Sequence, residues 1–263
     1  MAGITVSLAF LSFGNFIVSR ISVKGLSITL SLGLSYYSIT FPLYRCMKLI
    51  RMAIIAGLLI TFALTITMYP SAPETVVSHW NAAGQADGYL PKLWGLSLIP
   101  LIMTGLVALL VLLPRIDPYK SNYEKFRDYY DGFILLFVFF LLAIQVQIIL
   151  WSTGYRISPN LTLPFLMGTL FIYVGFLLDH AEQNWFVGIR TPWTLSSETV
   201  WKKTHELGGK LFKLAGIIAF AGVVAGEYAI WFVIVPVLAV ALVTMLYSYF
   251  EYRKEITGQT GKL

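Results

Sequence analysis

The stretch MAIIAGLLITFALTITMY, residues 52–69, contains no charged side chain. A second stretch, LWGLSLIPLIMTGLVALLVLL at residues 93–113, is also uncharged. A helix needs about 20 apolar residues to cross the hydrocarbon core of a bilayer, which is about 30 Å thick. Both stretches are therefore predicted to be membrane-spanning helices, and this prediction places the chain in the class of integral membrane proteins.

Three further apolar stretches lie at residues 132–151, 161–178 and 211–250, and the first two of them are uncharged. The last of them has 40 residues, of which only Lys213 and Glu227 are charged. Because Glu227 follows a glycine near the middle, where a turn belongs, we interpret this stretch as a hairpin of two helices. The sequence therefore predicts an all-α integral membrane protein of the cell membrane, with a six-helix transmembrane bundle.

The composition agrees with this class and excludes several others. Apolar and aromatic residues make up 57% of the 263 residues, charged residues make up 12%, and the mean hydropathy is +0.75. Soluble domains carry about 25% charged residues. The single cysteine, Cys46, cannot form an intramolecular disulfide or a cysteine cluster. The net charge of +6 does not indicate direct nucleic-acid binding, because the basic residues lie between apolar runs.

No pattern typical of an enzyme or a cofactor site occurs in the sequence. The phosphate-binding, dinucleotide-binding, zinc-protease and serine-nucleophile motifs are all missing. The three histidines, His79, His180 and His205, have no metal-ligand spacing. Ser196 lies nine residues before His205 on or beside one short helix, which implies no oxyanion geometry. We therefore predict no enzymatic activity, no cofactor and no metal.

Basic residues alternate between the segments that connect the predicted helices. Fifteen Lys and Arg residues lie before the first helix, in the second and fourth connections and in the tail, whereas two lie in the intervening connections. Cytoplasmic connections of membrane proteins collect Lys and Arg. We therefore expect both ends of the six-helix unit to be cytoplasmic, an N-in and C-in orientation, with residues 70–92 outside.

The first 46 residues fit this pattern poorly. Two uncharged halves could add a hydrophobic helical hairpin, but Arg20 and Lys24 between them would then face outside without an acidic partner. The segment also lacks the basic start of a signal peptide. The sequence MKLIRM at residues 47–52 is a short basic start that leads directly into a helix. We therefore predict that Met47 is the natural initiator, with an added N-terminal hairpin as the alternative.

The first connection, PSAPETVVSHWNAAGQADGYLPK at residues 70–92, is too long and too specific in composition for a simple tether. Asp87-Gly88 is a strong turn dipeptide, and we expect residues 73–80 to form a short helix. The aromatic side chains of this loop suit a membrane surface. Two interpretations remain open, an ordered loop with interfacial anchors or a surface that contacts a ligand. His79 and Asp87 alone do not complete a metal site.

The fourth connection, DHAEQNWFVGIRTPWTLSSETVWKKTHELGGK at residues 179–210, is the most distinctive segment. Thr194 or Ser196 can cap a helix whose first turn includes Glu198, and Gly208-Gly209 is expected to end that helix. One face of this helix carries a stripe of residues at spacings of three or four, namely Val200, Trp201, Thr204, Leu207 and Leu211. The stripe predicts an amphipathic helix on the inner membrane surface. The helix is either a lipid-facing connector or a docking surface.

Both connections resemble motifs of the SdpI family of multi-pass membrane proteins. HWNAAGQADGYLPK, residues 79–92, is similar to the outer-loop motif of the domain that opens many members. GIRTPWTLSSETVWKKTHELGGKLF, residues 188–212, is similar to the most characteristic stretch of the family, which lies ahead of the last two helices. The resemblance covers about residues 47–255 and does not include the first 46 residues.

The resemblance implies immunity against a secreted sporulation-delaying peptide toxin and, as in one member, the holding of a small transcriptional repressor at the membrane. On matching positions it implies an outer surface that senses or occludes the toxin, made of His79, Trp80, Asn81, Gly84, Asp87, Gly88 and Tyr89. It also implies an inner surface that docks a cytoplasmic transcriptional regulator, made of Arg190, Thr191, Pro192, Trp193, Ser196, Glu198, Trp201 and His205. Arg and Trp are enriched at binding hot spots, which agrees with a docking role.

The predicted organisation has three segments. Residues 1–46 form a hydrophobic extension, residues 47–131 hold the first two helices with the outer loop, and residues 132–263 hold four helices with the inner loop. Two other functions stay open. One is a membrane transporter or exporter of a toxic compound, for which Gln145 and Gln147 are polar candidates inside the membrane. The other is a structural membrane scaffold.

Overall fold

The computed structural model describes residues 7–13, 16–23, 26–33 and 37–260, with side chains described for residues 48–258. The chain divides into two units, Met1–Leu49 and Ile50–Leu263. In the described part, six helices are long and apolar enough to cross a membrane. This finding confirms the predicted all-α membrane bundle.

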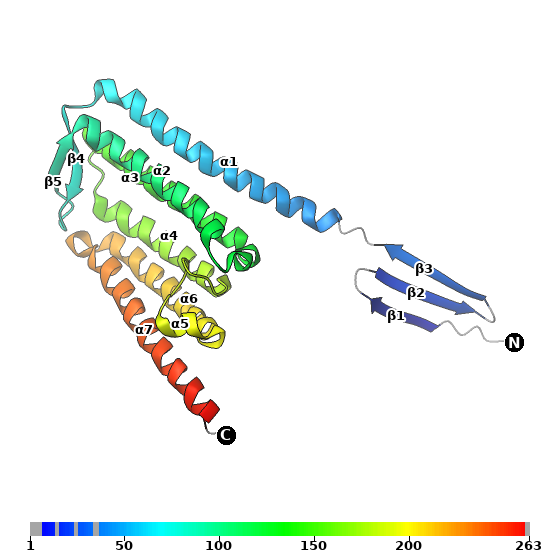
Figure 1. Cartoon of the computed structure of the whole chain (residues 1–263). Helices are drawn as coiled ribbons and strands as arrows, with labels where there is room; N and C mark the ends of the chain where they lie inside the picture. Colours follow the sequence, from blue (N-terminus) through cyan, green and yellow to red (C-terminus); the bar gives the residue numbers. More distant parts are fainter. Residues whose placement is uncertain (1–6, 14–15, 24–25, 34–36, 261–263) are drawn as a thin grey trace. The chain divides into compact units, whose positions relative to one another are not determined.

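The six long helices match the predicted apolar stretches (Figure 1). They are α1 (Tyr37–Met68), α2 (Lys92–Ile116), α3 (Arg127–Ser152), α4 (Pro159–His180), α6 (Glu198–Ala221) and α7 (Trp231–Thr260). The predicted C-terminal hairpin turns through two short 3₁₀ helices, η3 (Gly222–Val224) and η4 (Gly226–Tyr228). Gly226 has a φ of 58°, a left-handed conformation that glycine adopts without steric cost.

In the first unit, the segment that the alternative assigned to a helical hairpin forms strands instead. The strands β1 (Ser7–Phe13), β2 (Phe16–Val23) and β3 (Leu26–Gly33) pair in an antiparallel sheet of order β1-β2-β3. Apolar residues alternate with Ser or Thr along β3. A period of two favours a strand over a helix, which is the physical reason for the difference.

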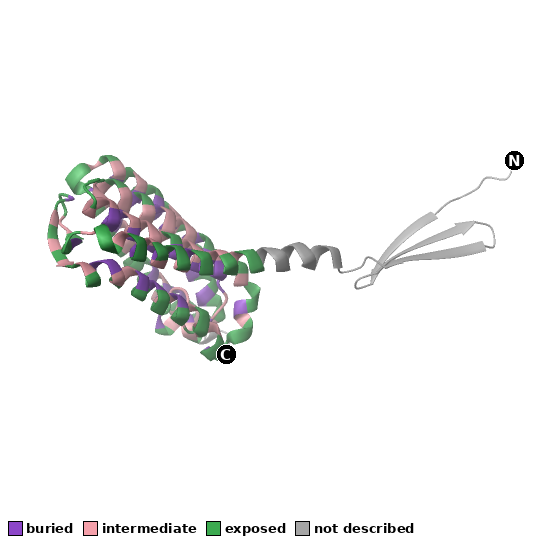
Figure 2. Ribbon diagram, turned by 90° about the horizontal axis from the view of Figure 1, so that it is seen from above, coloured by how far each residue is buried: buried purple, intermediate pink, exposed green. Residues whose placement is uncertain are grey.

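The second unit is built from two groups of helices. One core joins α1, α2 and α3 through side chains such as Ile54, Met103 and Val138. The other joins α4, α6 and α7 through Phe171 and Val233 among others. Figure 2 shows buried positions among the helices of this unit and exposed positions along them. The exposed positions include many large apolar residues. This outward apolar surface is what a bilayer-embedded bundle requires.

The expectation of a short helix at residues 73–80 is wrong. After the 3₁₀ turn η1 (Tyr69–Ser71), the strands β4 (Thr75–Trp80) and β5 (Ala86–Pro91) pair as an antiparallel hairpin with a register shift near His79. Three β-branched residues open β4, and they suit a strand. Val76 is buried against Leu96 of α2 and the end of α3, so tertiary packing supports the strand.

The expectation that Gly208-Gly209 ends a surface helix is also wrong. The helix α6 starts after its N-cap Ser197, not after Thr194 or Ser196, and continues through both glycines to Ala221. The predicted amphipathic segment is therefore the first half of the fifth spanning helix. A short separate helix, α5 (Pro192–Ser196), precedes it.

Glycines allow the backbones of α4 and α6 to pack in direct contact. A Cβ added at Gly209 would lie 2.9 Å from the Gly175 carbonyl oxygen, and one added at Gly216 would lie 2.6 Å from that of Gly168. The pairs lie seven residues apart on each helix, so they fall on one face. Small residues at membrane helix interfaces permit this close packing. The glycines therefore serve helix contact, which explains why they do not end the helix.

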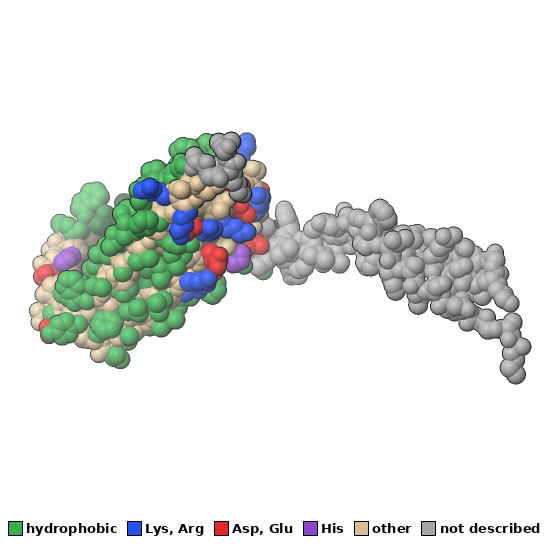
Figure 3. Space-filling model, turned by 90° about the horizontal axis from the view of Figure 1, so that it is seen from below, with side chains coloured by type: hydrophobic (Ala, Val, Ile, Leu, Met, Phe, Trp, Pro, Cys, Tyr) green, Lys and Arg blue, Asp and Glu red, His purple; other side chains and the backbone are tan. Residues whose placement is uncertain are grey.

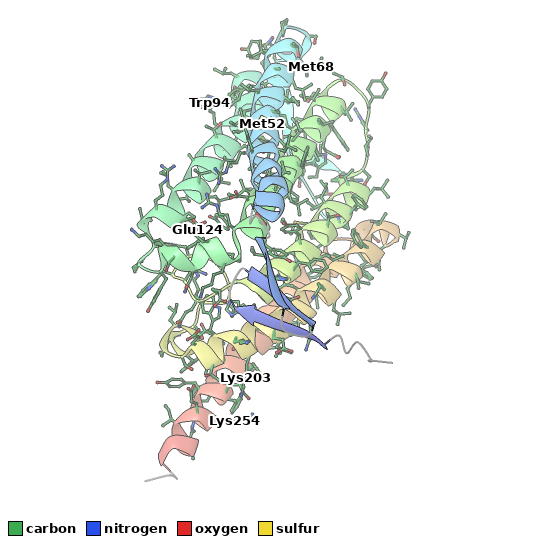
Figure 4. The ribbon with its side chains drawn as sticks, turned by 90° about the vertical axis from the view of Figure 1, so that its right-hand side faces the viewer. Met52, Met68, Trp94, Glu124, Lys203 and Lys254 are labelled. Carbon is green, nitrogen blue, oxygen red and sulfur yellow. The ribbon has the colours of Figure 1, made fainter. Side chains whose placement is uncertain are left out.

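The two ends of the bundle differ in charge. Figure 4 shows Met68 and Trp94 at one end and Glu124, Lys203 and Lys254 toward the other. On the face seen in Figure 3, Lys and Arg gather over one end while apolar side chains cover most of the remaining described surface. This separation agrees with the alternation of basic connections. The orientation relative to the cytoplasm stays a prediction.

Candidate functional site

The outer candidate site begins at the turn of the β4–β5 hairpin. The Asn81 side-chain oxygen accepts a hydrogen bond from the Gln85 backbone N–H at 3.0 Å, and the Gly84 N–H donates to the Asn81 carbonyl at 2.9 Å. Gly84 has a φ of 76°, which favours glycine. Asn81 and Gly84 therefore shape the turn of the hairpin.

The strands of the hairpin place a histidine beside a carboxylate. His79 Nδ1 lies 2.6 Å from Asp87 Oδ1, and both side chains are exposed. Gly88 pairs with His79 across the strands, where an added Cβ would lie 2.8 Å from the His79 Cβ. Tyr89 is exposed, whereas Trp80 is partly buried and packs edge-on against Trp151 of α3 at 5.6 Å. The sequence-predicted outer residues therefore share one hairpin.

One side chain joins three connections at the hairpin end of the bundle. Asn160, at the start of α4, donates from Nδ2 to the Ala82 carbonyl at 3.0 Å and to the Gly226 carbonyl at 2.9 Å. The hairpin turn, the α3–α4 connection and the α6–α7 turn therefore meet at this residue. Beside it lies a cleft of about 400 Å³. Its lining includes Ser78, His79, Trp80 and Asn81 together with the apolar residues Leu163 and Val233.

The inner candidate site begins with a capping box on α5. The Thr191 hydroxyl accepts from the Thr194 backbone N–H at 3.1 Å, and the Thr194 hydroxyl accepts from the Thr191 N–H at 2.9 Å. Pro192 occupies the first position of the helix, where a missing N–H has no cost. Thr191 is buried and also hydrogen-bonds Ser248 of α7 at 3.0 Å. The segment is thus fixed to the last helix.

Trp201 and His205 lie inside the protein, each 2% exposed. The Trp201 indole N–H donates to the Ala181 carbonyl at 2.8 Å, and its ring stacks on His205 at 3.9 Å. The Ile189 N–H donates to His205 Nε2 at 3.0 Å, so His205 Nδ1 carries the proton and donates to the Trp201 carbonyl at 2.8 Å. The pair holds the connection between α4 and α5 against α6.

The remaining inner residues lie at or near the surface. Arg190 is exposed, and its guanidinium donates to the Trp185 carbonyl at 2.8 Å. Trp193 is half-buried with its ring 5.1 Å from that of Tyr249. Pro192, Ser196 and Glu198 are exposed. Of the eight residues predicted here, Arg190, Pro192, Ser196 and Glu198 are therefore free to contact another molecule, and Trp193 partly so.

Sequence reasoning missed a polar network at the basic end of the bundle. Asp117 accepts from the Trp185 backbone N–H at 2.9 Å, and the Tyr123 hydroxyl lies 3.2 Å from both Asp117 Oδ2 and Asn184 Oδ1. Burial, reinforced by the Asp117 carboxylate, raises the pKa of Tyr123 well above its usual range, so the hydroxyl remains a donor. The network links the α2–α3 connection to the α4–α5 connection. No local motif marks it in the sequence.

The two glutamines considered for transport take part in packing. Gln145 is buried and donates to the Thr65 hydroxyl at 2.9 Å and to the Leu96 carbonyl at 3.0 Å, which joins α3 to α1 and α2. Gln147 donates to the Ile157 carbonyl at 2.7 Å and accepts from Thr162 at 2.8 Å. Both side chains therefore hold elements of the bundle together.

Two protein-family models match stretches of the chain that contain the candidate sites. The model of the SdpI/YfhL protein family matches residues 180–248, and the model of the Domain of unknown function (DUF1648) matches residues 56–104. The chain is 31% identical over 196 residues to the protein named Immunity protein SdpI from Bacillus subtilis (strain 168), which covers 74% of this chain and 92% of that relative. No solved structure matches the chain.

Proposed function

The chain belongs to the SdpI family, and from this membership we propose that it is an immunity protein whose outer cleft engages a secreted peptide toxin. The observation that carries the proposal is the meeting of three outer connections at Asn160, beside a cleft of about 400 Å³. Three of the seven outer residues that the resemblance implies, His79, Trp80 and Asn81, line this cleft.

The chemistry of the cleft suits a peptide that acts on membranes. Leu163, Val233 and Ile230 give it apolar walls, and His79 and Asn81 supply polar groups at the hairpin. Binding sites for such ligands combine a mostly apolar surface with a few placed polar groups. We infer that a toxin segment lies with its apolar side toward the helices and is thereby kept from the bilayer.

Replacing His79 by Ala is expected to reduce immunity without reducing folded protein. The His79 side chain is exposed, so its removal costs little stability, but it lines the cleft. We expect toxin-sensitive cells that express His79→Ala to die at a dose of sporulation-delaying peptide about tenfold lower than cells with the unchanged chain. The measurement is survival against toxin dose, with membrane abundance determined in the same cells.

Tyr155→Ala is the matched control. Tyr155 is 69% exposed, lies in the α3–α4 connection and does not line the cleft. Its truncation should leave the protective dose unchanged. Equal survival of the His79→Ala and unchanged strains at equal abundance would show that the cleft does not engage the toxin.

We further propose that the inner surface docks a cytoplasmic transcriptional regulator and responds to the outer cleft. The exposed residues Arg190, Pro192 and Glu198 would make the contact, beside a shallow cleft of about 400 Å³ that is lined by charged residues of α6. A chain of direct contacts from the outer loops to the inner segment supports such a response. Asn160 ties the outer loops to α4, and the glycine contacts tie α4 to α6, which carries the inner segment.

Toxin binding is then expected to change the dynamics of the inner segment. The measurement is amide hydrogen exchange of the full-length protein in lipid nanodiscs, with and without the sporulation-delaying peptide. We expect exchange of residues 182–198 to change by about fivefold or more, since allosteric couplings commonly have at least this size. Residues 138–149 in the core of α3 serve as the internal reference. Toxin binding that leaves residues 182–198 unaffected would contradict the signalling proposal.

A further inference from the structure

A third cleft lies at the opposite end of the bundle from the hairpin. It has a volume of about 640 Å³ and is formed by α1, α2, α3 and the 3₁₀ segment η2 (Lys120–Lys125). Its lining includes four basic side chains from four different elements, Arg51, Arg115, Lys120 and Arg127. Two carboxylates, Glu124 and Asp131, also line it. The lining therefore carries a net charge of +2.

The carboxylates neutralise only part of this charge. Asp131 is buried and lies 3.5 Å from Arg51 Nε and 3.3 Å from Arg127 Nε. Arg127 also pairs with Glu124 at 3.3 Å. Arg115 and Lys120 are exposed, and neither forms an ion pair with any residue whose side chain the structure describes. The cleft thus contains two cations without an ion pair beside the paired side chains of Arg51, Arg127, Glu124 and Asp131.

The other walls of the cleft are apolar. Ile54, Val111 and Ile134 line it beside the cations. Val111 is exposed, and so is Ile55, which lies next to Ile54 on α1. An occupant that has both a negative charge and a hydrocarbon chain would satisfy both parts of the lining. A free phosphate ion would leave the apolar part without a partner.

We propose that this cleft binds the headgroup of an anionic phospholipid from the cytoplasmic leaflet, with the phosphate between Arg115 and Lys120. Basic pockets between membrane helices on the cytoplasmic side bind such headgroups. The cleft lies at the basic end of the bundle, where the cytoplasmic surface is expected. Bound lipid would tie the C-terminal end of α2 to η2, and it would do so independently of any toxin.

The test compares two double variants of the full-length protein by native mass spectrometry. Arg115→Gln with Lys120→Gln removes the unpaired cations of the cleft. Lys202→Gln with Arg253→Gln removes two exposed cations of α6 and α7, so the change in net charge is the same. Phosphatidylglycerol and phosphatidylcholine with identical acyl chains are titrated against each protein, and inorganic phosphate is added in a parallel series.

The expected result is specific to the cleft. Loss of both cations should reduce the preference for phosphatidylglycerol over phosphatidylcholine by about thirtyfold, since each juxtamembrane cation contributes to binding anionic lipid. The control variant should lose less than about threefold. Unchanged preference in the cleft variant, or equal losses in both variants, would overturn the proposal. If inorganic phosphate displaced bound phosphatidylglycerol as effectively as added phosphatidylglycerol does, the cleft would be a free-anion site, and this result would overturn the proposal as well.

Discussion

Replacing Gly216 by Leu is expected to abolish close packing between α4 and α6 and to destabilise the whole second unit. The first added atom, a Cβ, would lie 2.6 Å from the Gly168 carbonyl oxygen and 2.9 Å from the Ile172 backbone nitrogen. These are backbone atoms of a helix, so they cannot turn aside as a side chain can. Overpacking a well-packed site costs about 1–3 kcal/mol, and a contact with backbone belongs at the upper end of that range.

The measurement is the fraction of detergent-solubilised protein that still elutes as a monodisperse species after heating. Gly105→Leu is the matched control, because Gly105 is an exposed glycine of α2 at which an added Cβ has nothing within 4 Å. That control should be as stable as the unchanged protein, because leucine also favours a helix. Equal stability of the Gly216 and Gly105 variants would show that α4 and α6 do not touch through glycine.

Replacing Asn184 by Ala is expected to release the connection between α4 and α5. Asn184 is fully buried, and its side-chain oxygen accepts from the backbone N–H groups of Phe186 at 2.9 Å and Val187 at 2.6 Å. Its amide nitrogen donates to the Glu182 and Val187 carbonyls at 2.8 and 2.9 Å. Truncation leaves these buried groups unpaired, and we expect a cost of about 3–5 kcal/mol.

Limited proteolysis of the purified full-length protein measures this release, because an opened connection is cut faster between residues 182 and 191. Asn122→Ala is the graded control. Among the residues whose side chains are described, the Asn122 side chain makes one hydrogen bond, to the Gln183 carbonyl at 2.6 Å, in the same region. Its loss should cost about 1 kcal/mol. Cleavage that is equally fast in the two variants would indicate that Asn184 does not organise the connection.

The positions of the spanning helices followed from residue composition along the chain. Hydropathy over about 20 residues depends on the local sequence alone, so four of the predicted stretches each coincide with one candidate membrane span and the stretch 211–250 covers the last two. The turn near Gly226 was found for the same reason, since a glycine and a charge interrupt an apolar run. The separation of basic from nonbasic connections likewise needed only a count along the chain.

The errors arose where a residue type has more than one structural role. Gly209 can end a helix or admit another helix, and the choice depends on whether Gly175 of a distant segment lies against it. Residues 75–80 form a strand because Val76 packs on Leu96 and the end of α3. A short apolar segment does not distinguish strand from helix by its pattern alone.

The candidate sites divide in the same way. Motif positions marked the loop of His79 and the segment of Arg190 as candidate sites, because both stretches resemble a known family. Contacts between distant segments decided which residues remain at the surface. Trp201 is buried, and its indole N–H donates to the Ala181 carbonyl, 20 positions away. Asn160 joins the hairpin turn and the α6–α7 turn to α4 through bonds to residues 78 and 66 positions away. Hydrophobic length is a local property of a chain, whereas burial and pairing are properties of the segments that meet.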